Sequence, residues 1–326
     1  MLCAHVLEYE TGHGFEALGS AGVEVFFALS GFLITAQLLE DHDAGRWSLR
    51  RFYERRARRL LPALAVLLVV LVALSSVMAT PLVTTVWPVV GYVANWWVIA
   101  GHGLGALSPT WSLAVEEQFY LVWPVLLLVA LRWRRGPVVL ASSVIAVSIA
   151  LRFGLASTDR VYAGSDTQAA SLVVGALLAI AATRGLRQLR VAAWLPGAAA
   201  VGLFSAAALG SWGYARLVPT VVPLVAVVLI WVLCSTSGTA LEWSWLRYAG
   251  RRSYAVYLWH TPLLWLAALA VGRGVVSALL GMGLTIGAAE LSWRLVEKRW
   301  LRNARHPVEE LVGDDSGRAG RPVGAQ

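Results

Sequence analysis

A small set of ionisable side chains lies within or at the edge of long apolar stretches. In a hydrocarbon environment such groups are costly to keep, so each is a candidate functional residue. His5 lies in MLCAHVLEY, Glu24 opens GVEVFFALSGFLIT, and Glu116 and Glu117 lie in SPTWSLAVEEQFYLVWP. The remaining members of the set are Arg152, Asp166, His260 and Glu290.

The histidine near the N-terminus suggests proton-transfer chemistry. An imidazole can take a proton from a hydroxyl near neutral pH, and a nearby carboxylate can orient its ring and stabilise the imidazolium. His5 with Glu24 or Glu116 would form such a pair if their helices meet. Ordinary alternatives are a packed or interfacial imidazole for His5 and a carboxylate at the outer membrane interface for Glu24.

The other candidates also have structural interpretations. Glu116 and Glu117 follow Ser108 and Ser112, either of which could cap a helix start, so both carboxylates could favour the positive end of that helix. His260, which lies beside Trp259, is interpreted as a hydrogen-bonded structural histidine.

An arginine-rich stretch, RRFYERRARRLLPA, precedes an apolar run. Such a block ordinarily fixes membrane topology and binds anionic lipid. The alternative is a phosphate clamp, because the guanidinium group matches phosphate oxygens in bidentate fashion. The four candidate clamp residues are Arg55, Arg56, Arg58 and Arg59.

Composition indicates what must position these residues. The 326 residues are 58% hydrophobic and only 14% charged, with a mean hydropathy of +0.66. These values predict a polytopic membrane protein of the all-α class, because long continuous apolar runs favour helices over the alternating pattern of barrel strands. Cys3 and Cys234 have no metal-ligand spacing, and we expect no metal site.

The net charge of +8 comes from arginine blocks between apolar runs, which is typical of positive-inside topology and not of nucleic-acid binding. The blocks expected on the cytoplasmic side are 46–59, 132–135, 184–190, 247–252 and 298–305.

About ten spans place every block on one face, provided that segment 83–109 enters the membrane without crossing it. The first expected span is too short for the roughly 20 residues that a crossing helix needs, which favours a truncated start. We expect the tail, 303–326, to be disordered and cytoplasmic. The expected spans are 1–9, 22–39, 60–79, 113–131, 137–156, 168–183, 191–212, 217–235, 253–271 and 275–296.

Six stretches in this order resemble the acyltransferase-3 family of integral membrane O-acyltransferases, and LVEKRW closes the resemblance. It covers about residues 1–302, which we expect to form one membrane acyltransferase domain. The stretches are AHVLEY, GVEVFFALSGFLIT, RRARRLLPA, SPTWSLAVEEQFYLVWP, SDTQAASLVVGALLA and RRSYAVYLWHTPLLW.

The resemblance implies a role for several of these residues. His5 matches the family's catalytic histidine, and the family's paired loop arginines match Arg56 and Arg59, or Arg55 and Arg58 one register earlier. Two positions depart from the family pattern. The family's first-span arginine would fall before Met1, and Gln168 stands where the family has arginine.

The function implied is transfer of an acyl group, most simply acetyl, from cytoplasmic acyl-CoA to a hydroxyl group. The acceptor would be a surface glycan, glycolipid or secreted molecule, and the protein would lie in the plasma (inner) membrane among its lipids. His5 would act as general base or transient acyl carrier, with Glu24 or Glu116 as its partner. The alternatives are a transporter or flippase, in which buried acids bind protons or substrate, and an inactive truncated remnant.

Overall fold

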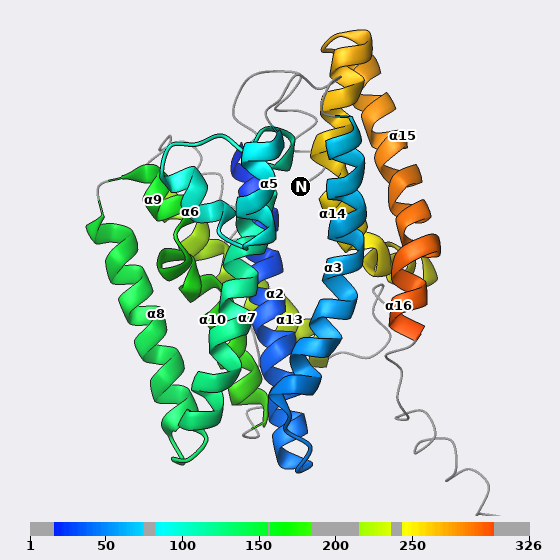
Figure 1. Cartoon of the computed structure of the whole chain (residues 1–326). Helices are drawn as coiled ribbons and strands as arrows, with labels where there is room; N and C mark the ends of the chain where they lie inside the picture. The colour runs from blue at the N-terminus through cyan, green and yellow to red at the C-terminus, as the bar shows by residue number, and fades with distance from the viewer. Residues whose placement is uncertain (1–15, 75–81, 156, 184–214, 236–242, 303–326) are drawn as a thin grey trace, which may run out of the picture.

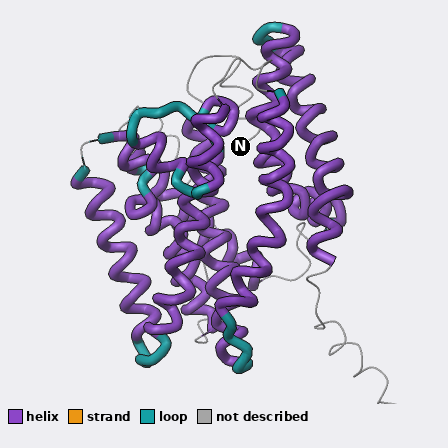
Figure 2. The backbone as a smooth tube through the Cα atoms, viewed as in Figure 1, coloured by secondary structure: helices purple, strands orange, loops and turns teal. Residues whose placement is uncertain are grey.

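The computed structural model describes residues 16–74, 82–155, 157–183, 215–235 and 243–302. Figure 2 shows helices joined by loops and turns in these residues, so the predicted all-α class is confirmed. The helices, in chain order, are α2 (Glu16–Asp43), α3 (Leu49–Ala73), α5 (Leu82–Val90), α6 (Ala94–Ile99), η1 (Gly105–Leu107), α7 (Thr110–Ala130), α8 (Gly136–Gly154), α9 (Thr158–Ala163), α10 (Ser165–Thr183), α13 (Val218–Ser235), α14 (Ser244–Val271), α15 (Val275–Ser292), the π-helical turn η3 (Trp293–Glu297) and α16 (Lys298–Arg302).

Six helical segments of the described chain are long and apolar enough to cross a membrane. Two expected spans, 1–9 and 191–212, lie outside the described residues, as do His5 and the tail 303–326, so the count of ten stays a prediction. The six segments are Gly19–Asp43, Thr110–Ala130, Gly136–Gly154, Thr158–Thr183, Ser244–Val271 and Val275–Trp300.

Parts of three arginine blocks that we expected between the spans lie in helices, and residues 298–302 of the last block form α16. Residues 50–59 belong to α3, where Ser48 caps the helix by accepting a hydrogen bond from the amide of Arg51 (3.3 Å), and residues 247–252 belong to α14. Arginine is a good helix former, so the helices continue past the apolar run that a span requires.

The segment predicted not to cross the membrane forms two short α-helices and the 3-10 turn η1. α5 has nine residues and α6 has six, about 14 and 9 Å of helix, and neither can span a bilayer. A tight turn joins them, with Tyr92 at a φ of 52°. Gln118 of α7 anchors the turn by donating to the Tyr92 carbonyl (2.7 Å) and to the Asn95 side-chain oxygen (3.0 Å).

The centre of the bundle is the contact between α2 and α10, which α7, α8 and α13 surround (Figure 1). Glycine permits the close approach of these two helices. A Cβ atom on Gly31 would lie 1.8 Å from the Leu172 carbonyl oxygen, and one on Gly175 would lie 1.8 Å from that of Ala28. Small residues at such crossings let helix backbones pack tightly where lipid supplies no hydrophobic drive.

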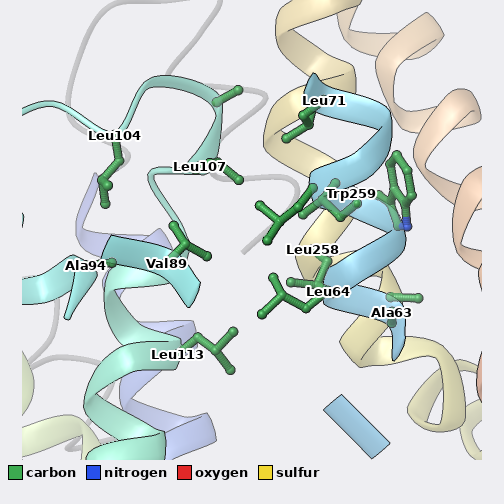
Figure 3. Close-up of a cluster of buried hydrophobic side chains, with 14 of the residues drawn as sticks. Ala63, Leu64, Leu71, Val89, Ala94, Leu104, Leu107, Leu113, Leu258 and Trp259 are labelled. Atoms are coloured by element: carbon green, nitrogen blue, oxygen red, sulfur yellow. The ribbon is translucent and has the colours of Figure 1, made fainter. Parts of the chain in front are cut away.

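A second group of helices, α3, α14 and α15, lies beside this centre (Figure 1). A buried apolar cluster connects the two groups. Figure 3 shows Leu71, Leu258 and Trp259 of α3 and α14 on one side of it, and Val89 and Leu113 of α5 and α7 on the other.

Candidate active site

A cavity of about 360 Å³ lies between α2, α7 and α14. Its walls are largely apolar and include Val23, Phe26, Leu113 and Val256. Six polar side chains also line it, namely Ser112, Glu116, Ser253, Tyr254, Tyr257 and His260. A mostly apolar cavity with a few convergent polar groups is the usual form of a small-molecule site.

Glu116 is the carboxylate of this cavity. It is 3% exposed and accepts short hydrogen bonds from the Ser30 hydroxyl of α2 and the Tyr120 hydroxyl of α7. α7 begins at Thr110, so Glu116 lies nearly two turns inside the helix. The capping interpretation therefore does not hold for Glu116, whose side chain is held from two helices.

A guanidinium group lies behind this carboxylate. Arg56 stacks on the Tyr120 ring, with its Cζ atom 3.5 Å from the ring centroid, and its Nη2 lies 3.5 Å from Glu117 Oε1. Tyr92, in the turn after α5, approaches the same charges, and burial together with the Glu117 charge raises the pKa of Tyr92 to about 12. The charge of Arg56 thus acts on both Glu116 and Glu117, and its side chain is only 17% exposed.

His260 is the imidazole that the described residues bring to the cavity, although the sequence favoured a purely structural role. It is 2% exposed, and its Nδ1 lies 2.6 Å from the Tyr257 carbonyl oxygen. A carbonyl only accepts, so Nδ1 carries a proton, and in the neutral ring Nε2 is the basic nitrogen. The sequence signal was its place in the motif RRSYAVYLWHTPLLW, where an imidazole lies in an apolar run.

Tyr257 and Ser112 form a polar contact across the cavity from α14 to α7. Their hydroxyl groups are in short contact, and the Pro109 carbonyl oxygen lies within hydrogen-bond distance of both, 3.1 Å from the Ser112 hydroxyl and closer to that of Tyr257. Because each hydroxyl has a single proton, two hydrogen bonds join these three groups. This contact fixes the wall that bears Glu116 relative to the wall that bears His260.

Glu24 is wholly buried but does not line this cavity. Neither carboxylate oxygen makes a hydrogen bond to a described residue, although Arg152 and the Ser171 hydroxyl act on its charge. The interface interpretation of Glu24 is therefore wrong, because its side chain is enclosed by protein. Val23 and Phe26 turn one face of α2 toward the cavity, while Glu24 projects from a different face.

Arg152 supplies a positive charge near Glu24, in the region where Gln168 departs from the family pattern. Its guanidinium is wholly buried and donates to the carbonyl oxygens of Pro219 (2.7 Å) and Thr167 (2.5 Å). The Pro219 carbonyl is free for side-chain donors, because Pro223 has no amide hydrogen with which to bond the residue four positions earlier, and it accepts from both Arg152 and Ser171. Gln168 itself donates to the Tyr162 carbonyl oxygen (2.6 Å).

The four candidate clamp arginines have different surroundings. Arg55 pairs with Asp41 (3.0 Å), Arg56 faces Glu117, and Arg58 is exposed. Arg59 lines a second cavity, of about 920 Å³, between α3 and the start of α14. The described residues include no group of three or more His, Cys, Asp or Glu side chains that could hold a metal ion.

Comparisons with known proteins agree with this architecture. The family model described as an acyltransferase domain (Acyl_transf_3) matches residues 1–293. The peptidoglycan O-acetyltransferase OatA of Listeria monocytogenes is 31% identical over 329 residues, which cover 90% of this chain and 53% of that protein. YrhL of Bacillus subtilis, provisionally named for the same activity, is 31% identical over 90% of this chain and 52% of its own length.

A Staphylococcus aureus protein provisionally named as an O-acetyltransferase is 28% identical over 86% of this chain and 52% of its own length. The chain therefore spans about half the length of the curated relatives it matches. No solved structure matches it. The family match covers most of the chain, and the chain belongs to the acyltransferase-3 family of multi-pass membrane proteins.

Proposed function

We propose that the chain is an O-acetyltransferase of the bacterial cytoplasmic membrane that moves an acetyl group from acetyl-CoA to a hydroxyl of peptidoglycan or another surface glycan. The family match and the names of the relatives support this class of reaction. The single observation that carries the proposal is the cavity in which the buried carboxylate of Glu116 and the imidazole of His260 face the same space.

The chemistry needs a base, a way to stabilise charge, and exclusion of water. A base takes the proton from the acceptor hydroxyl as its oxygen attacks the thioester carbonyl carbon. The carbon–sulfur bond then breaks, and the leaving thiolate takes the proton back from the imidazolium. A buried carboxylate such as Glu116 favours the imidazolium while the proton is held.

We assign His5, the histidine that the resemblance selects, as the general base or as a transient acyl carrier. His260 is the second candidate base, because it shares the cavity with Glu116. The largely apolar walls would keep water from hydrolysing the thioester. Glu24, paired with Arg152, would hold the helices that enclose the chamber.

The test is transfer of radiolabelled acetyl from acetyl-CoA to peptidoglycan or its lipid-linked precursor, in membranes that contain the chain. Label in the glycan that disappears in His5→Gln, and not in His260→Gln, would identify His5 as the base or carrier. The reverse pattern would assign the base to His260. No label from the wild-type protein, with its folded amount verified and several glycan acceptors supplied, would refute the proposed function and favour a transporter or flippase.

A further inference from the structure

The second cavity is strongly basic. It has a volume of about 920 Å³, and a single carboxylate, Glu297, lies among its lining residues. Its lining includes residues from three of the basic blocks that positive-inside topology places on the cytoplasmic side, 46–59, 247–252 and 298–305. Its cationic side chains are Arg59, Arg247, Arg251, Arg252 and Lys298.

One of these cations is fixed by the protein itself. Arg252 forms a salt bridge with Glu290 of α15, and its Cζ atom lies 3.4 Å from the ring centroid of Tyr248 and 5.5 Å from that of Trp293. Arg294 also pairs with Glu290 (2.5 Å). Arg252 therefore has its counter-charge within the fold.

The other cations of the cavity are not neutralised in this way. Arg247, Arg251 and Lys298 are exposed and form no ion pair with a carboxylate of the described chain. Arg59 forms none there either, although its charge acts at longer range on Glu297 and Glu116. Like charges that converge on a hollow raise the local positive potential and concentrate anions there. Such a site fits a ligand with several phosphate charges.

The basic cavity adjoins the cavity of Glu116. Tyr254 lines both, and its hydroxyl donates to the Leu60 carbonyl oxygen (3.1 Å), which fixes the ring next to Arg59. A ligand whose phosphates occupied the basic cavity could thus extend past Tyr254 toward the acidic one. The basic cavity lies within the roughly 300–1,000 Å³ typical of sites for small molecules and cofactors.

We propose that this basic cavity binds the phosphates of the nucleotide end of the acyl-CoA donor, and that the thioester arm passes Tyr254 to reach the cavity of Glu116 and His260. This inference rests on the proposed function and specifies its donor site. It differs from the clamp expected from the sequence, because Arg55, Arg56 and Arg58 do not line the cavity. The binding residues lie mainly on α14 and α16, with Arg59 contributed by α3.

The experiment measures equilibrium binding of radiolabelled acetyl-CoA to the purified chain in detergent. Three variants remove single charges, namely Arg247→Gln, Arg251→Gln and Lys298→Gln, and the matched control is Arg132→Gln in the exposed turn after α7. A charge-assisted hydrogen bond to phosphate corresponds to roughly a tenfold change in affinity. We expect about that loss for each cavity variant that contacts a phosphate directly, and less than twofold for the control.

A second acetyl donor, which has no phosphates, shows whether binding depends on them. Acetyl-pantetheine has the same thioester arm but no nucleotide, so the cavity variants should bind it as the wild-type protein does. Equal losses for both donors would overturn the inference, because the substitutions would then have acted on folding or on the inner cavity. Wild-type affinity for acetyl-CoA in all three variants would also overturn it.

Anionic lipid headgroups share the phosphate chemistry and are distinguished by a further arm. The binding measurement is repeated in nanodiscs of neutral lipid and of lipid with anionic headgroups. If the variants lose co-purified anionic lipid and keep their affinity for acetyl-CoA, the cavity is a lipid site and the inference fails. If the wild-type protein transfers acetyl while the variants bind donor normally, only the donor-site inference fails; if the wild-type protein neither binds nor transfers, the proposed function fails.

Discussion

The buried pair of Glu24 and Arg152 gives a stability prediction that follows directly from burial. Both side chains are wholly buried, and each acts on the charge of the other. Removing one partner leaves an uncompensated charge inside the bundle, which typically costs about 3–5 kcal/mol. We therefore expect Glu24→Gln and Arg152→Met each to lower the free energy of unfolding by about that amount.

The hydrogen bonds of Arg152 add little to this cost. When the guanidinium is removed, Ser171 still donates to the Pro219 carbonyl (3.2 Å) and Ser148 still donates to that of Thr167 (2.9 Å). Neither carbonyl is left without a partner, so most of the loss comes from the unpaired carboxylate. The double variant has neither charge. Its loss of unfolding free energy should therefore be smaller than the sum of the two single losses, by at least about 2 kcal/mol.

The assay is unfolding in mixed detergent micelles by increasing SDS, followed by tryptophan fluorescence of the purified variants. The control is the exposed pair Arg50 and Glu54, for which the same cycle should give a coupling of about 0.5 kcal/mol or less. Additive losses for Glu24 and Arg152, with the control cycle behaving as expected, would refute the reasoning that these two charges compensate each other.

Further predictions concern packing and the site. Gly175→Leu should lower the free energy of unfolding by at least about 1–3 kcal/mol, because its Cβ would meet the Ala28 carbonyl. The control is Gly283→Leu, since nothing lies within 4 Å of a Cβ at that position. Equal thermal stability of the two variants would contradict the packing argument. Tyr120→Phe removes a hydrogen-bond donor to Glu116 and should lower the acetyl-transfer rate about tenfold at unchanged folded yield. An unchanged rate would mean that this hydrogen bond does not contribute to the reaction. Gln118→Leu frees the α5–α6 turn from α7, so amide hydrogen exchange in residues 91–95 should become faster, and unaltered protection would show that another contact holds the turn.

Much of the fold could be predicted because lipid leaves few solutions. An apolar run such as 113–131 must satisfy its backbone groups internally, so it forms a helix close to its sequence limits, as α7 does. The short segment 83–109 was also recognisable, because its proline and glycines interrupt any run long enough to span.

The site could be predicted only in part, because the direction of a side chain depends on how each helix rotates in the bundle. Successive residues of a helix differ by about 100°, so neighbouring arginines such as Arg55, Arg56 and Arg59 face different partners. The electrostatic interaction between Glu24 of α2 and Arg152 of α8 has no local sequence signal. For the same reason His260 was identifiable as a buried imidazole but not as a residue that shares a cavity with Glu116.

The central claim is that acetyl transfer takes place in the cavity that contains Glu116. Its most direct test is the single-turnover rate of acetyl transfer from bound acetyl-CoA to a glycan acceptor, in the wild-type protein, in Glu116→Gln and in the exposed control Glu54→Gln. We expect Glu116→Gln to bind acetyl-CoA but transfer it at least about 100-fold more slowly, which is the usual contribution of a group that supports proton transfer, while Glu54→Gln keeps the wild-type rate. A wild-type rate in Glu116→Gln would contradict the account and move the reaction away from this cavity.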